Sequence, residues 1–150
     1  MTFHQKNKKT RFLFCFVSNL HYFCIMRQRV VIALGSNYRA ISHVRKAREC
    51  LSNVVNIDRF SRNMWTEAID IPSPRFLNCV AIGWTEMTID ELTQTLKSLE
   101  SILGDSAEER RSGRVHIDLD VLCYGDDLHH LSDWKRDYII TLYNEIIQAR

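Results

Sequence analysis

The chain of 150 residues contains 45% hydrophobic and 25% charged residues, which is ordinary for one globular domain with a core of its own. Its formal net charge is only +2, and four of its 20 basic residues precede Met26, in a segment that has no acidic residue. The remaining 16 basic and 18 acidic residues argue against an extended nucleic-acid-binding surface and favour small-molecule partners.

Residues 1–25 differ from the rest of the chain, and we treat them as an N-terminal extension to a domain at 26–150. The apolar run Phe12–Val17 is too short for a membrane-spanning helix, and no small-residue cleavage site of a secretory signal follows it. Strand-like residues begin at Val30, almost directly after Met26. We therefore expect Met26 to be the natural start, with the preceding residues an over-long gene model. A disordered or peripherally packed extension is the alternative.

The first expected strand is the apolar run Val30–Leu34, which stops at the turn residues Gly35-Ser36-Asn37. A short continuous apolar run of this kind is typical of a central strand buried on both faces. Apolar residues then recur at near-helical spacing from Ile41 to Leu51, which predicts an amphipathic helix.

The middle of the chain predicts two antiparallel strands and a second helix. Val54–Ala68 and Arg75–Thr85 are rich in β-branched and aromatic residues, and the prolines at 72 and 74 place a loop between them. Thr88 and Glu91 have the spacing of a capping box at the start of a helix, which Gly104 should end.

The last third predicts a loop, a strand and a terminal helix. Asp105–Gly113 reads as a flexible, charged, anion-binding loop, Val115–Tyr124 as a strand and Arg136–Gln148 as a helix. The order strand, helix, strand, strand, helix, strand is a split βαβ pattern. It predicts an α+β ferredoxin-like sandwich, an antiparallel sheet with helices packed on one face.

The strongest chemical signal lies in the last strand. Alternation along Val115–Tyr124 should send His116, Asp118 and Asp120 to one face. Two carboxylates sharing a sheet face raise each other's pKa unless a cation lies between them, and Mg²⁺ prefers such hard oxygen ligands. A solvated pair on an edge strand is the plain alternative.

The five cysteines, at positions 15, 24, 50, 79 and 123, show no CxxC pair, zinc spacing or dense disulfide pattern. A reducing, cytoplasmic location is the simplest interpretation. Cys50, Cys79 and Cys123 lie in apolar segments, which favours inert core thiols.

Four segments together resemble the signatures of the 6-hydroxymethyl-7,8-dihydropterin pyrophosphokinase family. They are Ile32–Asn37, Thr66, Phe76–Asn78 and Ile117–Leu122, in the family's order and at plausible separations. The resemblance implies a ferredoxin-like core, two Mg²⁺ ions, and transfer of pyrophosphate from ATP to the pterin hydroxymethyl group in folate synthesis, with release of AMP.

The resemblance also implies roles for individual residues. Asp118 and Asp120 would hold the metal. The pterin would be bound by Gly35, Thr66, Asn78 and Tyr138. The nucleotide would be contacted by Glu100, His130 and Arg136, with His130 also counted among the catalytic groups.

The loop arginines depart from the family's register. Arg110, Arg111 and Arg114 are expected to meet the phosphates from neighbouring positions, because a flexible loop needs a guanidinium within reach more than a fixed register. This departure keeps a second hypothesis open, a catalytically impaired module of the same fold that binds a pterin or nucleotide. The expected partners are ATP and the pterin, without nucleic acid or membrane, and the sequence does not indicate an oligomeric state.

Overall fold

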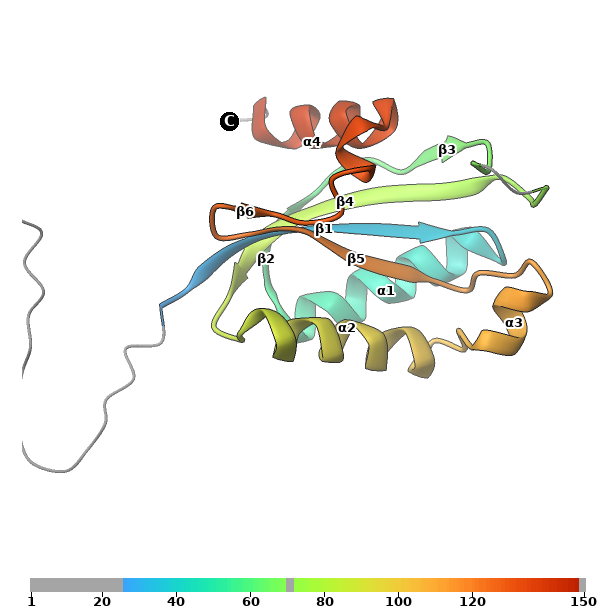
Figure 1. Ribbon diagram of the computed structural model, residues 1–150, viewed down its shortest axis with the longest axis horizontal. Helices are drawn as coiled ribbons and strands as arrows, with labels where there is room; N and C mark the ends of the chain where they lie inside the picture. Colours follow the sequence, from blue (N-terminus) through green and yellow to red (C-terminus); the bar gives the residue numbers. More distant parts are fainter. Residues whose placement is uncertain (1–25, 70–71, 149–150) are drawn as a thin grey trace, which may run out of the picture.

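The computed structural model describes residues 26–69 and 72–148, so the expectation for residues 1–25 lies outside the described residues. The elements in chain order (Figure 1) are β1 (Gln28–Ser36), α1 (Ala40–Val54), β2 (Asn56–Phe60), β3 (Met64–Thr66), β4 (Phe76–Thr85), α2 (Ile89–Ile102), α3 (Ala107–Arg111), β5 (Asp118–Tyr124), β6 (Asp127–Leu128), the short 3₁₀ helix η1 (Asp133–Lys135) and α4 (Asp137–Gln148). Among the helices of these two ranges, none is both long enough and apolar enough to cross a bilayer.

The sheet is antiparallel, with the order β2-β4-β1-β5-β6, and β3 also pairs with β4. β1 lies between its two long partners: Ile32 is paired with Ala81 of β4 and with Val121 of β5. Val30 and Ile32 are fully buried. The predicted central strand is therefore confirmed.

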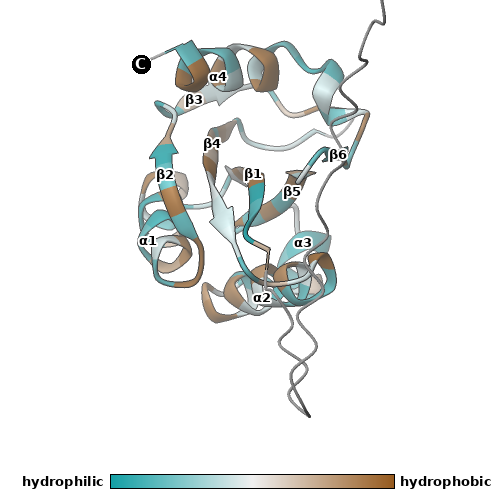
Figure 2. Ribbon diagram, turned by 90° about the vertical axis from the view of Figure 1, so that its left-hand side faces the viewer, coloured by the Kyte–Doolittle hydropathy of each residue, from teal (hydrophilic) through white to brown (hydrophobic). Residues whose placement is uncertain are grey.

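Helices cover both faces of this sheet (Figures 1 and 2). α1 and α2 pack on one face, over a core that includes Ile32, Leu119 and Val121. The α+β class and the ferredoxin-like sandwich are confirmed, with these two helices on a common face as expected. α4 lies on the opposite face, where Leu142 packs in a second core with Leu122, so the expectation that the helices pack on one face does not hold for α4. That face needs a cover because apolar residues alternate onto both sides of the central strands.

The predicted cap of α2 is present. Thr88 N donates to Glu91 Oε2 at 2.7 Å, and Thr88 Oγ1 accepts from Glu91 N, so the capping box is complete. Gly104 follows the helix with φ of 94°, a left-handed conformation that glycine adopts without strain.

The strand predicted over Val54–Ala68 is two short strands instead, because Ser61 interrupts it. Ser61 is buried, its N–H donates to Val80 O at 2.8 Å, and its hydroxyl accepts from Val80 N at 2.9 Å. The serine side chain thus replaces one ladder bond, and β3 starts only at Met64.

The strand predicted from Val115 begins only at Asp118, because the preceding residues bond to the turn after β1. Val115 N donates to Asn37 Oδ1 at 2.7 Å, and Val115 O accepts from Asn37 N at 3.1 Å. His116 therefore does not join the face of the two aspartates. Its ring lies 4.8 Å from the rings of both Tyr38 and His43.

The segment predicted as a flexible loop contains α3. Ser106 caps this short helix by accepting from Glu109 N at 3.2 Å. Cys79 lies in the core, Cys50 and Cys123 are partly buried, and burial raises the pKa of the Cys79 and Cys123 thiols. Both of these thiols are accordingly weak nucleophiles.

Candidate active site

One pocket gathers most of the residues that the sequence singled out. It lies on the α4 side of the sheet and is lined from β1, β3, β4, β5, η1 and α4. Its lining includes Gly35, Thr66, Asn78, Asp118, Asp120, Arg136 and Tyr138, together with Phe76 and Asp133. Residues more than 100 positions apart therefore meet in one place.

The two aspartates enter the pocket from β5. Antiparallel pairing sets Asp118 opposite Gly35 and Asp120 opposite Ala33, while Leu119 between them is buried in the core on the other face. Burial first, and the charge of Asp118 second, raise the pKa of Asp120 to about 6. A divalent cation would relieve both effects, so this pair suits a Mg²⁺ site.

Polar and small residues of three strands form another part of the lining. Asn78 is almost fully buried, and its Nδ2 donates to Thr66 Oγ1 at 2.8 Å. Strand register places Gly35 opposite Asn78. A Cβ on Gly35 would lie 3.2 Å from Asn78 Oδ1 and 3.8 Å from the Phe76 ring. The glycine thus leaves space for a flat ligand beside the asparagine amide.

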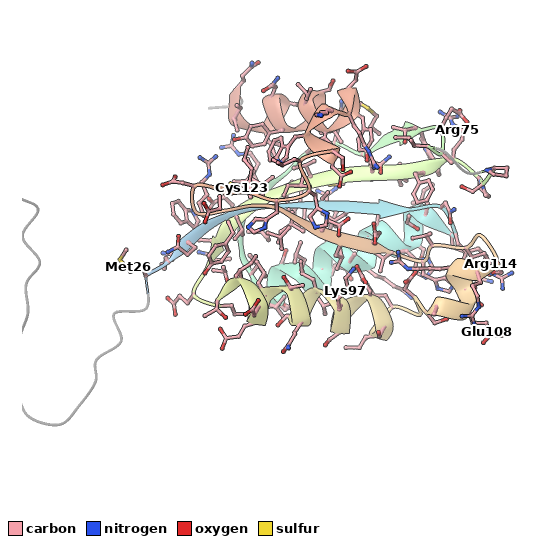
Figure 3. The ribbon with its side chains drawn as sticks, in the orientation of Figure 1. Met26, Arg75, Lys97, Glu108, Arg114 and Cys123 are labelled. Atoms are coloured by element: carbon pink, nitrogen blue, oxygen red, sulfur yellow. The ribbon has the colours of Figure 1, made fainter. Side chains whose placement is uncertain are left out.

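Of the three loop arginines, the structure brings Arg110 to the aspartates. Arg110 Nη2 donates to Asp118 Oδ1 at 2.9 Å. Arg114 instead donates through Nε to Glu109 Oε2 at 2.6 Å, and its guanidinium lies 5.6 Å from the Tyr38 ring. Figure 3 shows Arg114 at the α3 end of the molecule, with Cys123 toward the opposite end of the sheet. Arg111 is exposed at the end of α3.

Asp105 fixes the position of Arg110 beside Asp118, a role that the sequence did not suggest. Its Oδ2 accepts from Arg110 Nε, and its Oδ1 accepts from His116 N at 3.0 Å. The sequence offered one signal for this role: Asp105 directly follows the helix-ending Gly104 and precedes Arg110 by five residues. Many solvated loops share that pattern, so it lacked specificity.

The turn before α4 carries the remaining charged groups. His130 Nε2 is 3.8 Å from Asp120 Oδ1, and Arg136 Nη1 donates to the Tyr138 hydroxyl at 3.2 Å. Asp133 lies between the histidine and the arginine, three residues from each, and sequence reasoning missed it. Its only signal was the spacing of an acid three residues from a histidine and three residues from an arginine.

A second groove meets the pocket at Asp120, which lines both. It runs beside α2 and β5 and is lined by Thr93, Lys97 and His130, among others. Lys97 brings a positive charge to this groove, beside the imidazole ring of His130, so the groove suits an anionic ligand.

Glu100 lines neither the pocket nor the second groove. Its side chain is buried between α2 and β5, where Oε1 accepts from Leu119 N at 2.7 Å and from Lys97 Nζ at 2.9 Å. The carboxylate therefore fixes the strand backbone between the two aspartates and holds the lysine of the second groove.

Comparison with known proteins gives relatives of one kind. The chain is 30% identical over 124 residues to a folate synthesis bifunctional protein of Arabidopsis thaliana, and 34% identical over 107 residues to one of Chlamydia muridarum. These matches cover 75% and 65% of the chain. A mitochondrial folate synthesis bifunctional protein of Arabidopsis thaliana is 32% identical over 74% of the chain.

The chain spans only about a quarter of the length of these relatives, namely 26%, 23% and 22%. The family model for 7,8-dihydro-6-hydroxymethylpterin-pyrophosphokinase, in contrast, matches residues 31–148, which include every element from α1 to α4. This chain therefore belongs to the 7,8-dihydro-6-hydroxymethylpterin-pyrophosphokinase family.

Proposed function

We propose that the domain transfers a pyrophosphoryl group from ATP to the hydroxymethyl oxygen of 6-hydroxymethyl-7,8-dihydropterin, releasing AMP, as a step of folate synthesis. One observation carries the proposal: the bonded pair Thr66 and Asn78 lines the same pocket as the carboxylates of Asp118 and Asp120. A polar bicyclic ring and a metal-bound phosphate chain can therefore lie side by side. Membership of the family supports the same reaction.

The pterin lies against Gly35, with its ring edge hydrogen-bonded by Asn78 and Thr66 and its face against Tyr138. Support comes from the buried amide, which is already oriented by its 2.8 Å bond to Thr66, and from the aromatic side chains of the lining. Flat heteroaromatic rings bind well between such groups.

Asp118 and Asp120 hold two Mg²⁺ ions, which neutralise phosphate charge when bound. ATP lies along the second groove, so that its phosphates approach Asp120. Lys97, His130 and Arg136 face the anion, and Glu100 acts through the lysine that it holds.

The chemistry needs no protein nucleophile, since the pterin alcohol attacks the β-phosphorus directly. The residues of the chain orient the two substrates and oppose the charge that develops on the phosphate. Arg110 is best placed for this, because its contact with Asp118 can be exchanged for a phosphate oxygen. Arg111 and Arg114 serve the same anion after Arg114 leaves Glu109.

The test is AMP formation from ATP and the hydroxymethyl-dihydropterin, measured with and without Mg²⁺. We expect turnover that requires Mg²⁺ and is lost in Asp118→Ala. Binding of both ligands without turnover would instead support the impaired binding module. No binding of either ligand by the folded protein would reject both functions.

We place the protein in the cytoplasm, on the support of the free thiols of Cys50, Cys79 and Cys123. The alternative compartment is the mitochondrion, because one relative is a mitochondrial folate synthesis bifunctional protein. Fractionation of source cells with an antibody to residues 26–150 decides between the two.

A further inference from the structure

The turn between β6 and α4 carries an acidic side chain that no step of the proposed reaction uses. Asp133 is the first residue of η1, and its side chain is only 15% exposed. It lines the same pocket as Asp118 and Asp120. An acid at this place would repel a triphosphate unless its charge is balanced by cations.

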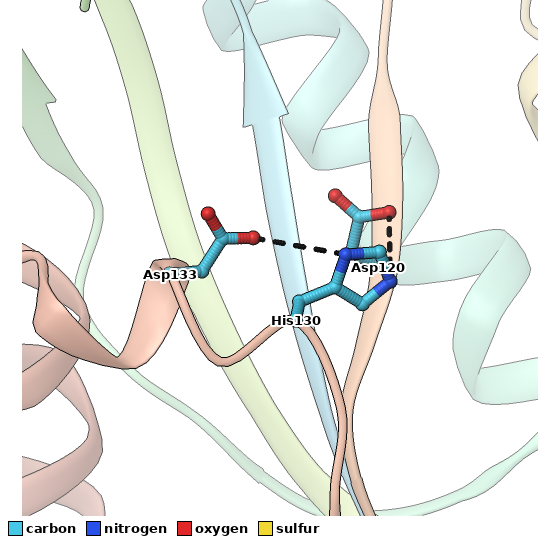
Figure 4. A group of neighbouring side chains, drawn as sticks. All are labelled: Asp120, His130 and Asp133. Carbon is cyan, nitrogen blue, oxygen red and sulfur yellow. Dashed lines mark ion pairs between the residues drawn. The ribbon is translucent and has the colours of Figure 1, made fainter.

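The contacts of Asp133 supply one such cation, Arg136, and place the His130 ring nearby. Its Oδ1 is 3.1 Å from Arg136 Nη2, and its Oδ2 is 4.0 Å from His130 Nδ1. Figure 4 shows the His130 ring between the carboxylates of Asp133 and Asp120, with Nε2 toward Asp120. Tyr138 contacts the other side of the Arg136 guanidinium. One carboxylate thus contacts a guanidinium and an imidazole ring from different parts of the turn.

The backbone of the turn is built around the same residue. Asp133 N donates to His130 O at 2.8 Å, and Arg136 N donates to Asp133 O at 3.0 Å. His130 has φ of 49°, a left-handed conformation that is uncommon for residues with a side chain, and the hydrogen bond from Asp133 N to His130 O helps to stabilise it. The orientation of His130 therefore depends on the contacts of the turn.

We infer that Asp133 is a positioning residue for ATP, whose carboxylate binds Arg136 and lies beside the His130 ring, so that both side chains meet the same phosphate chain. This inference rests on the proposed function. A carboxylate that fixes the ring of a ligand-binding histidine and the fork of an arginine reduces the side-chain freedom that binding would otherwise remove. Asp133 itself does not touch the nucleotide.

The test compares Asp133→Asn with the unaltered protein, using calorimetry with a non-hydrolysable ATP analogue and Mg²⁺, and steady-state kinetics. Asparagine keeps the shape and removes the charge. We expect the Kd for the analogue and the KM for ATP to rise about tenfold. The KM for the pterin should stay unchanged and kcat should fall less than about threefold. Asp133→Glu should recover part of the affinity.

Asp126→Asn is the matched control, because it removes one negative charge from an exposed residue of the β5–β6 turn. It should bind the analogue like the unaltered protein. Thermal unfolding of both variants checks that they fold. Equal Kd values for Asp133→Asn and the unaltered protein would overturn the inference while leaving the proposed function intact.

A double-mutant comparison separates positioning from direct contact. In a His130→Ala, Arg136→Ala background, Asp133→Asn should change the Kd by less than about twofold. A tenfold loss that persists in this background would overturn the inference, as would a shift in the Mg²⁺ concentration needed at saturating ATP. Failure of the unaltered protein to bind the analogue would refute the proposed function and the inference with it.

Discussion

The side chain of Asp120 lies in surroundings that disfavour its charge. Its pKa of about 6 results from burial and from Asp118, and His130 and Lys97 only partly oppose these effects. An aspartate in an unfolded chain has a pKa of about 3.9. A raised pKa in the folded state means that the contribution of Asp120 to stability is fully present below about pH 4 and is lost as the pH rises through about 6.

Asp120→Asn should therefore stabilise the metal-free protein at pH 7.5, by about 1 to 2 kcal/mol after allowance for solvent screening. At pH 4 the two proteins should differ by less than about 0.5 kcal/mol, because Asp120 is then mostly protonated. Urea unfolding at both pH values measures the difference. Added Mg²⁺ should stabilise the unaltered protein more than the variant. A gap of the same size at pH 4 and 7.5 would contradict the assigned cause.

Gly35→Ala tests the part of the pocket that we propose for the pterin. Its Cβ would lie 3.2 Å from Asn78 Oδ1, so the amide must give by a few tenths of an ångström, which strains its bond with Thr66. We expect the KM for the pterin to rise about tenfold with the KM for ATP unchanged. Equal increases in the two KM values would show that Gly35 does not serve the pterin alone.

At the scale of elements, α2 supports the strand that carries Asp118 and Asp120. Glu100 reaches from the helix to Leu119 N, between Asp118 and Asp120, and also binds Lys97. Buried hydrogen bonds to a charged group contribute more to stability than exposed ones. The helix thus holds the backbone of β5 in place from the face opposite the pocket.

Glu100→Ala should lower the free energy of unfolding by about 2 to 3 kcal/mol, because Leu119 N loses its buried acceptor. Glu86→Ala, at an exposed position before α2, is the matched control and should stay within about 0.5 kcal/mol. Chemical denaturation measures both. A loss in Glu100→Ala no larger than in the control would mean that the strand does not depend on this carboxylate.

The segment that contains α3 should affect the transfer step more than the binding of the pterin. Replacing Arg110, Arg111 and Arg114 jointly by Ala should lower kcat by about 100-fold while changing the pterin Kd less than about threefold. Arg110→Ala alone should produce most of the loss, since Arg110 contacts Asp118. Single-turnover kinetics and calorimetry give the two quantities. Parallel loss in both would argue against a role at the phosphate.

At the scale of the whole molecule, the pocket depends on the packing of α4. Ile139, Leu142 and Ile146 bury one stripe of the helix against the second core. The first turn of the same helix carries Tyr138 into the pocket. Docking of the C-terminal helix thus completes a site whose other parts come from the sheet.

Leu142→Ala should destabilise the protein by about 2 to 4 kcal/mol, because the side chain is fully buried in that core. Ile140→Ala, on the exposed side of α4, should cost less than about 1 kcal/mol. Thermal and chemical unfolding test the pair. Similar losses in the two variants would mean that α4 is not docked through this stripe.

Local patterns were sufficient for much of the fold. The apolar run Val30–Leu34, the capping box at Thr88 and the glycine at 104 each depend on neighbours within a few residues, and each prediction is confirmed. The strand predicted over Val54–Ala68 does pair antiparallel with β4, but as two pieces, β2 and β3, because Ser61 bonds to Val80, which is far away in the chain.

The sequence by itself determined the α+β class and the pairing of Asp118 and Asp120 on one face, because strand alternation and helical periodicity are local properties of the chain. Only the tertiary structure decided that Arg110 reaches Asp118, that His116 leaves the aspartate face and that Asp133 joins His130 to Arg136. Contacts of long side chains depend on where separate elements come to lie, and no periodicity in the sequence encodes that placement.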